Sequence, residues 1–94
     1  MPTFGVPPKG TQVSMETLLS YRQKQILLRL GCGLTEEVIA EKLEVSLSTV
    51  EKDREQAYRI MKQNSLVMAL TAAMAKGEIK PEDLIFMYRM HYGI

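Results

Sequence analysis

The 94-residue sequence contains no tryptophan and a single cysteine, and its formal net charge is only +1. One cysteine cannot form an intrachain disulfide, so a reducing, cytoplasmic setting is favoured over a secreted one. The first residues lack the basic start and apolar run of a signal peptide. The longest weakly polar stretch, residues 66–75, is too short to cross a bilayer. We therefore expect a soluble, cytoplasmic protein that makes no membrane contact.

Residues suited to catalysis or metal binding are equally scarce. His91 is the only histidine and Cys32 the only cysteine, so by themselves they do not supply the ligands of a usual metal site. Cys32 lies between two glycines, which favours a turn residue over a nucleophile, since no further histidine is present to activate it. We expect neither an enzyme nor a bound cofactor.

The weak net charge also bears on nucleic acid as a partner. A clearly basic surface is the usual footprint of a DNA-binding protein, and +1 neither supports nor excludes one. The hydrophobic fraction of 46% is sufficient for one compact core, and a chain of this length makes one domain. The net charge does not show whether the protein binds nucleic acid, so the local distribution of charge has to be considered.

Changes in composition divide the chain into three parts. Residues 1–14 contain three prolines and two glycines without periodicity, which predicts a flexible arm: a disordered leader, or an arm that reaches DNA or a partner. Residues 15–79 are expected to form the main helical domain, and residues 80–94 a C-terminal helical extension. The sequence shows no strand pattern, so the predicted fold class is all-α.

Capping residues mark the start of each expected helix. Ser20, Thr35 and Ser46 are suited to cap the first three, because their hydroxyls accept hydrogen bonds from unpaired backbone N–H groups. A fourth helix over residues 66–76 is apolar nearly all round, which indicates that more than one of its faces is buried. Pro81 suits the first position of a fifth helix, where its missing N–H would have no partner.

The most informative segment is residues 35–50, which has the pattern of a helix-turn-helix. Such a motif needs a small residue in its first helix, because the second helix crosses there at close range, and Ala40 fits. The second helix needs a cap and a polar outward face, which Ser46 and residues 47–59 supply. Apolar residues flank the expected crossing at Ile39, Leu43, Val45 and Val50.

This joint pattern resembles the DNA-binding domain of LuxR/GerE-type transcription regulators. The resemblance covers about residues 18–79, and region 4 of bacterial sigma factors is similar over the first three helices. It implies a four-helix LuxR/GerE-type helix-turn-helix domain with an additional C-terminal helix. The matching positions are Leu19, Ser20, Arg22, Ile26, Leu27, Leu30, Gly33, Thr35, Ile39, Ala40, Leu43, Ser46, Thr49, Val50, Ala69 and Gly77.

The resemblance further implies that the third helix, about residues 46–62, reads the major groove, and that the fourth helix forms the seam of a homodimer. Glu51, Lys52 and Glu55 would face bases. The residues expected to touch phosphates are Thr49, Arg54, Arg59 and Lys62. The expected DNA-binding residues are Thr49, Glu51, Lys52, Arg54, Glu55, Arg59 and Lys62, and the expected dimer-interface residues are Leu66, Leu70, Ala73 and Met74.

The third helix departs from the family pattern in its charge. Glu51, Lys52 and Asp53 stand where the family usually has a base-contacting lysine, and Glu55 occupies an often basic position. We take this charged run to be exposed. The family's Leu-Gly-Val after the helix is replaced by Met-Lys-Gln at residues 61–63.

These departures weaken the attraction to DNA. The third helix carries +1 and the second −3, whereas DNA affinity comes largely from neutralising phosphates. A glutamate can accept a hydrogen bond from cytosine N4, a contact worth ~1–3 kcal/mol of discrimination, but it adds no general attraction. The cations expected to anchor the DNA backbone are Lys52, Arg54, Lys62, Arg22 and Lys24.

Two functions therefore follow from the sequence. The first is a homodimeric regulator that binds double-stranded DNA through the third helix. The alternative is a helix-turn-helix module that binds RNA polymerase, a sigma factor or another regulator. The acidic second helix favours the alternative, as does the fifth helix, which is a candidate surface for a protein partner.

Overall fold

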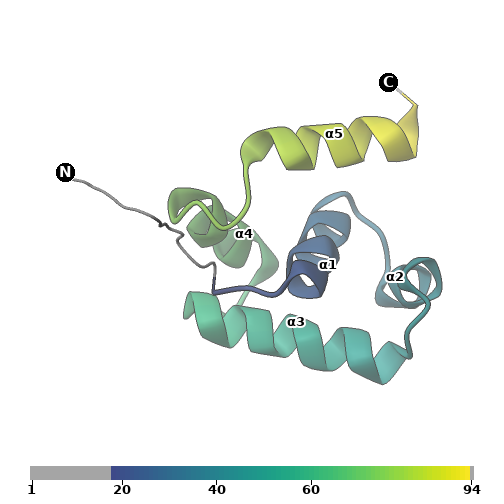
Figure 1. Cartoon of the computed structure of the whole chain (residues 1–94), viewed down its shortest axis with the longest axis horizontal. Coiled ribbons are helices and arrows are strands. Elements are labelled where there is room, and N and C mark those ends of the chain that lie inside the picture. Colours follow the sequence, from purple (N-terminus) through teal and green to yellow (C-terminus); the bar gives the residue numbers. More distant parts are fainter. Residues whose placement is uncertain (1–17, 94) are drawn as a thin grey trace, which may run out of the picture.

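A computed structural model describes residues 18–93, and Figure 1 shows this part of the chain as five helices joined by short turns. No strand occurs between residues 18 and 93, so the all-α prediction is confirmed. The expectation of a flexible arm over residues 1–14 lies outside the described residues. The helices are α1 (Tyr21–Gly31), α2 (Glu36–Leu43), α3 (Leu47–Met61), α4 (Leu66–Ala75) and α5 (Pro81–Tyr92).

The helices begin where the capping residues predicted. Ser20 Oγ accepts a hydrogen bond from the Gln23 backbone N–H at 3.0 Å, and Gln23 Oε1 accepts one from the Ser20 N–H at 2.9 Å, which completes a capping box. The hydroxyls of Thr35, Ser46 and Ser65 accept hydrogen bonds in the same way at the starts of α2, α3 and α4. These caps fix the register of each helix.

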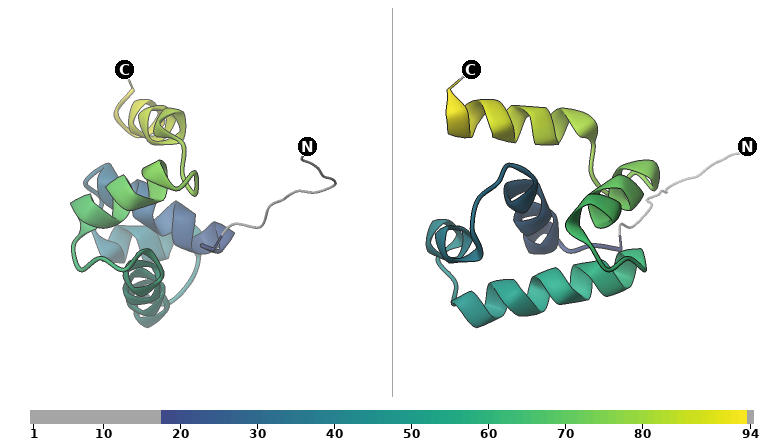
Figure 2. Two further views of the ribbon diagram at one scale, coloured as in Figure 1. Left: turned by 90° about the vertical axis from the view of Figure 1, so that its left-hand side faces the viewer. Right: turned by 180° about the vertical axis from the view of Figure 1, so that it is seen from behind.

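The core has two parts that share α1. On one side, Ile26 of α1 packs with Ile39, Ala40 and Val50 of the helix-turn-helix. On the other, α1 packs against α3 and α4, and α5 adds partly buried side chains. The buried residues of this second cluster are Leu19, Leu27, Leu28, Ala57, Met61, Leu70, Ala73 and Ile79. Figures 1 and 2 show α1 lying among the other helices.

The crossing of α2 and α3 has the expected form. Ala40 is 7% exposed and Val50 is fully buried, so the two helices meet at close range. Between them, Glu44 takes the left-handed conformation at φ 59°, and the Val45 N–H donates to the Ala40 carbonyl at 3.0 Å. The turn therefore sets α3 across α2, with one side of α3 against the core and the other side facing outwards.

The charged run of α3 is not exposed throughout, and Asp53 corrects that expectation. Asp53 is 8% exposed and forms an ion pair with Arg22 of α1. The positions that face the core are 50, 53, 57 and 61, which repeat every three or four residues, so Asp53 belongs to the inner face. The pair fastens α1 to α3 through Arg22 Nε, while the Arg22 side chain stays half exposed.

Helix α5 lies across α1 on the side opposite α3, as Figures 1 and 2 show. None of its residues is buried, although Leu84 and Met87 pack against the core. At its far end Tyr92 Oη donates a hydrogen bond to the Cys32 carbonyl at 2.5 Å. A Cβ on Gly31 would come within 2.9 Å of Leu70 and 3.1 Å of Leu84, so a glycine allows α4 and α5 to approach α1.

Within residues 18–93, no helix combines the length and apolar character that a membrane crossing needs.

The end of α3 provides a stability prediction. Lys62 takes the left-handed conformation at φ 60°. It stands where the Leu-Gly-Val pattern of LuxR/GerE-type domains has its glycine. A side chain in this conformation costs roughly 1–2 kcal/mol, which glycine avoids. We expect Lys62→Gly to unfold at higher urea concentration than Lys62→Ala, with a free energy of unfolding larger by ~1 kcal/mol. Both variants lose the same charge, so equal stabilities would show that the conformation is not strained.

The Arg22–Asp53 pair gives a second prediction. Asp53→Ala removes the buried partner of an arginine that is itself half exposed, and we expect it to lower the free energy of unfolding by ~1 kcal/mol in urea denaturation. Glu55→Ala, on the exposed side of the same helix, should change it by less than ~0.5 kcal/mol. Similar losses from the two variants would contradict the inner placement of Asp53.

Candidate nucleic-acid interface

The outward face of α3 is a polar strip. Ser48, Lys52, Glu55, Arg59 and Lys62 are exposed and follow one another at intervals of three or four residues, which places them on one side of the helix. The opposite side carries the core contacts of Val50 and Ala57. The 15 residues of α3 span ~22 Å, the size of rod that a major groove admits.

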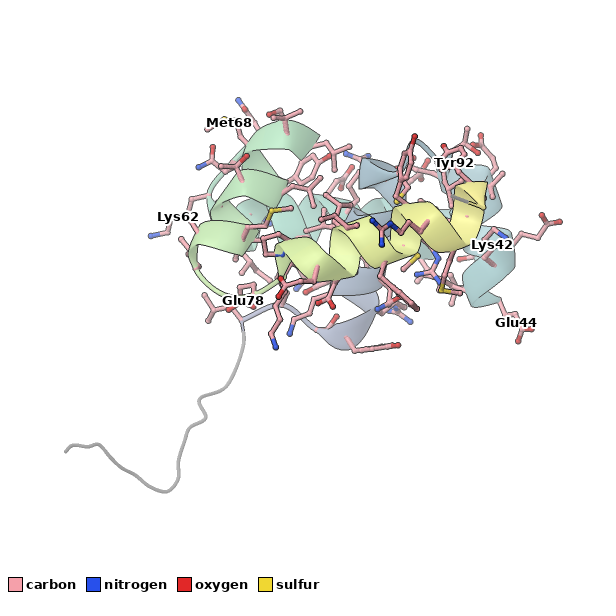
Figure 3. The ribbon with its side chains drawn as sticks, turned by 90° about the horizontal axis from the view of Figure 1, so that it is seen from above. Lys42, Glu44, Lys62, Met68, Glu78 and Tyr92 are labelled. Carbon is pink, nitrogen blue, oxygen red and sulfur yellow. The ribbon has the colours of Figure 1, made fainter. Side chains whose placement is uncertain are left out.

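Four of the seven sequence-predicted DNA contacts lie on this strip: Lys52, Glu55, Arg59 and Lys62. Two others lie at its edge. Glu51 is partly exposed, and the Thr49 hydroxyl is 2.8 Å from Ser46 Oγ, so Thr49 is held in the cap of the helix. In Figure 3, Lys62 points away from the domain at the end of α3.

Arg54 is the seventh predicted contact, and the structure commits it elsewhere. Its Nε donates to Glu36 at the start of α2, and its guanidinium lies 5.5 Å from the centre of the Tyr58 ring. Although burial acts to lower it, the hydrogen bond and charge of Glu36 raise the pKa of Arg54 above its ordinary value. Arg54 therefore braces α2 against α3, and a phosphate would have to compete with Glu36 for it.

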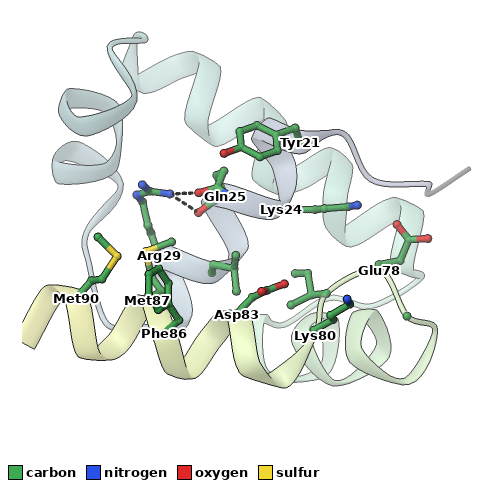
Figure 4. A pocket seen from close by; sticks show the side chains of 13 residues that line it. Tyr21, Lys24, Gln25, Arg29, Glu78, Lys80, Asp83, Phe86, Met87 and Met90 are labelled. Atoms are coloured by element: carbon green, nitrogen blue, oxygen red, sulfur yellow. Dashed lines mark hydrogen bonds between the residues drawn. The ribbon is translucent and has the colours of Figure 1, made fainter. Parts of the chain in front are cut away.

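The two anchors expected on the first helix, Arg22 and Lys24, have other neighbours within the protomer. Arg22 is paired with Asp53. Lys24 lines a groove between α1 and α5 (Figure 4), and α5 lies on the side of α1 away from α3 (Figure 1). The cations left to attract phosphates along α3 are Lys52, Arg59 and Lys62, a smaller set than the sequence suggested.

Exposed carboxylates surround the start of the strip. Glu37, Glu41 and Glu44 are exposed on α2, and Glu51 and Glu55 follow on α3. Figure 3 shows Glu44 pointing outwards at the end of the molecule opposite Lys62. The electrostatic character of the face therefore changes along α3, from acidic near α2 to basic near Lys62.

Sequence reasoning missed Ser48 and Gln56, which are exposed on or beside the strip. The three-to-four residue spacing that places Lys52 and Glu55 also places these two, so the signal was present. Ser48 Oγ lies 3.1 Å from Ser46 Oγ, and Gln56 accepts a hydrogen bond from Gln23 at 3.1 Å. Both side chains are exposed, so a partner that binds the polar strip of α3 can contact them.

The predicted dimer-interface residues lie mainly inside the protomer. Leu70 and Ala73 are buried in its core, and Leu66 and Met74 are partly buried against it. The surface that α4 offers to a partner consists instead of Val67, 71% exposed, and Met68, 48% exposed, with Thr71 beside them. The apolar character of α4 did not distinguish its buried side from its exposed side, so the sequence could not select the residues that a partner would meet. Figure 3 shows Met68 pointing outwards.

Among the described residues, no group of three or more potential ligands could hold a metal ion. Burial raises the pKa of the Cys32 thiol, against the opposing charge of Arg29, which keeps the thiol protonated at neutral pH.

Comparisons with known proteins agree with this geometry. The family model of bacterial regulatory proteins of the luxR family matches residues 17–73, which is more than half of the chain. The match contains α1, α2 and α3 and ends inside α4, so α5 lies beyond it. Searches of curated proteins and of solved structures each found no match. The capped α3, crossed by α2 at Ala40, is thus the helix-turn-helix of a recognised domain, and the chain belongs to the luxR family of bacterial regulatory proteins.

Proposed function

We propose that this protein is a cytoplasmic transcription regulator that binds double-stranded DNA by placing α3 in the major groove. The observation that carries the proposal is the outward strip of α3, which starts at a capped N-terminus and holds Lys52, Glu55 and Arg59 clear of the core. A rod of this kind presents its first turns to base edges. Membership of the luxR family supports the same function.

The side chains on the strip divide into two roles. Lys52 lies in the first half of α3 and Glu55 just past its middle, where they can meet base edges: a lysine recognises guanine O6 or N7, and a glutamate accepts from cytosine N4. Arg59 and Lys62 lie towards the other end and are placed for phosphates. With about three cations per protomer, the slope of log K against log salt should be about −3 per bound protomer.

We further propose that the protein acts as a homodimer through the exposed side of α4. Val67 and Met68 form an apolar patch there, beside partly buried Leu66. Two protomers related by a two-fold axis would present their α3 helices to half-sites about one helical turn apart.

A second candidate is a protein-interaction module that binds RNA polymerase or another regulator. Glu37, Glu41 and Glu44 favour it, because an exposed row of carboxylates on α2 repels a phosphate backbone and attracts a basic protein surface. This candidate predicts binding to a basic protein and no selective binding to DNA.

Substitution of Lys52 tests the DNA-binding proposal. After selection of a binding sequence from random duplexes, we expect Lys52→Glu to weaken its binding by ~1–3 kcal/mol, because a base contact is lost. Lys76→Glu makes the same change in net charge at the end of α4, away from α3, and should retain selective binding. Mobility-shift titrations at two salt concentrations provide the measurement. Absence of selective binding at low salt would reject the proposal in favour of the second candidate.

The dimer has its own test. We expect Val67→Glu combined with Met68→Glu to sediment as a monomer with unchanged helical circular dichroism, because both side chains are exposed in the protomer. Ile85→Glu, at an apolar position 52% exposed on α5, is the matched control and should remain dimeric. A monomeric wild type, or dissociation by the control alone, would contradict an α4 seam.

A further inference from the structure

A groove of about 650 Å³ runs between α1 and α5, on the side of the domain away from α3. Figure 4 shows Tyr21, Lys24 and Gln25 of α1 on one side and Asp83, Phe86 and Met90 of α5 on the other. Phe86 is 64% exposed and Met90 67% exposed. Helix α5, which forms this wall, has no buried residue. Within the described part of the chain, nothing covers its apolar side chains on the groove.

The chain enters the described structure at one end of this groove. Both oxygens of the Glu78 carboxylate accept hydrogen bonds from the Leu18 N–H, at 2.9 and 3.0 Å, and one also accepts from the Leu19 N–H at 2.9 Å. Glu78 itself lines the groove, as do Lys24 and Lys80. Leu18, the first described residue, is therefore held at the rim of this groove.

We propose that residues 12–17 of the same chain occupy the groove and that Val13 and Met15 cover the apolar side chains of α5. Two lengths support this occupant. The eight residues of α5 from Asp83 to Met90 span ~10 Å. Met15 and Val13 precede Leu18 by three and five residues, so an extended chain carries them at most ~10 and ~17 Å from that anchor.

The sequence pattern of this segment suits the groove. Residues 12–16 read Gln-Val-Ser-Met-Glu, which alternates polar and apolar side chains. In an extended chain, alternate side chains point to opposite sides, so Val13 and Met15 share one side and Gln12, Ser14 and Glu16 share the other. An apolar floor therefore accepts the first pair while the polar side chains face water.

Charge supports the same direction of entry. Lys24 and Lys80 lie at the rim, and neither has an ion-pair partner among residues 18–93. The lining has three cations, Lys24, Arg29 and Lys80, against the carboxylates of Glu78 and Asp83. Glu16 comes two residues before the Leu18 anchor, so its carboxylate is within reach of the two lysines. In this arrangement the segment runs away from α3 and covers α5, so it does not reach DNA bound at α3. The inference does not depend on the proposed function.

Because the sequence contains no tryptophan, a single reporter can follow the groove. Phe86→Trp places an indole on its α5 wall at an exposed position. In the full chain carrying this reporter, we expect a blue-shifted emission and protection from acrylamide. Adding Val13→Asp and Met15→Asp should remove both the shift and the protection. The matched control adds Gln12→Asp and Ser14→Asp, the same two charges on the other side of the extended segment, and should keep them.

Circular dichroism and the urea midpoint show that each variant is folded before its fluorescence is compared. The proposal is overturned if the indole is equally exposed in all three proteins, or equally protected in all three. It is also overturned if both double variants lose the protection alike, because then added charge and not the loss of apolar contact is responsible. Protection that disappears on dilution in every variant would assign the groove to a second copy of the chain.

Discussion

The contact of Ile26 with Ile39 and Val50 is the constraint on which the domain depends. All three side chains are fully buried, and they come from α1, α2 and α3. Ala40 completes the contact because a larger side chain there would separate the two crossing helices. These contacts fix the orientation of α3. One side of the helix therefore faces the core, and its polar side faces outwards.

Much of the architecture could be predicted from the sequence because its signals are local. Ser20, Thr35 and Ser46 each form the cap that their position suggested, and Pro81 begins α5. The family resemblance and the family model agree on the helix-turn-helix. These features depend on residues within a few positions of one another.

The partners of the charged side chains could not be predicted, because they depend on contacts between helices. Asp53 belongs to a charged run that reads as a solvated face, yet it reaches Arg22, 31 positions earlier. Arg54 reaches Glu36 across the α2–α3 corner. The two sides of α4 were likewise indistinguishable in an all-apolar helix, and only the fold places Leu70 inside and Val67 outside. The polar strip of α3 consequently offers fewer unpaired cations than the sequence suggested.

The shared position of α1 has a consequence for cooperativity. Both core clusters include residues of α1, so neither can lose its packing while the other persists, and helices α1 to α4 should unfold in a single two-state transition. Helix α5 stands outside this unit, since it has no buried residue of its own. Its amide hydrogens are then the first to exchange with solvent, which makes α5 the segment that opens without loss of the rest of the fold.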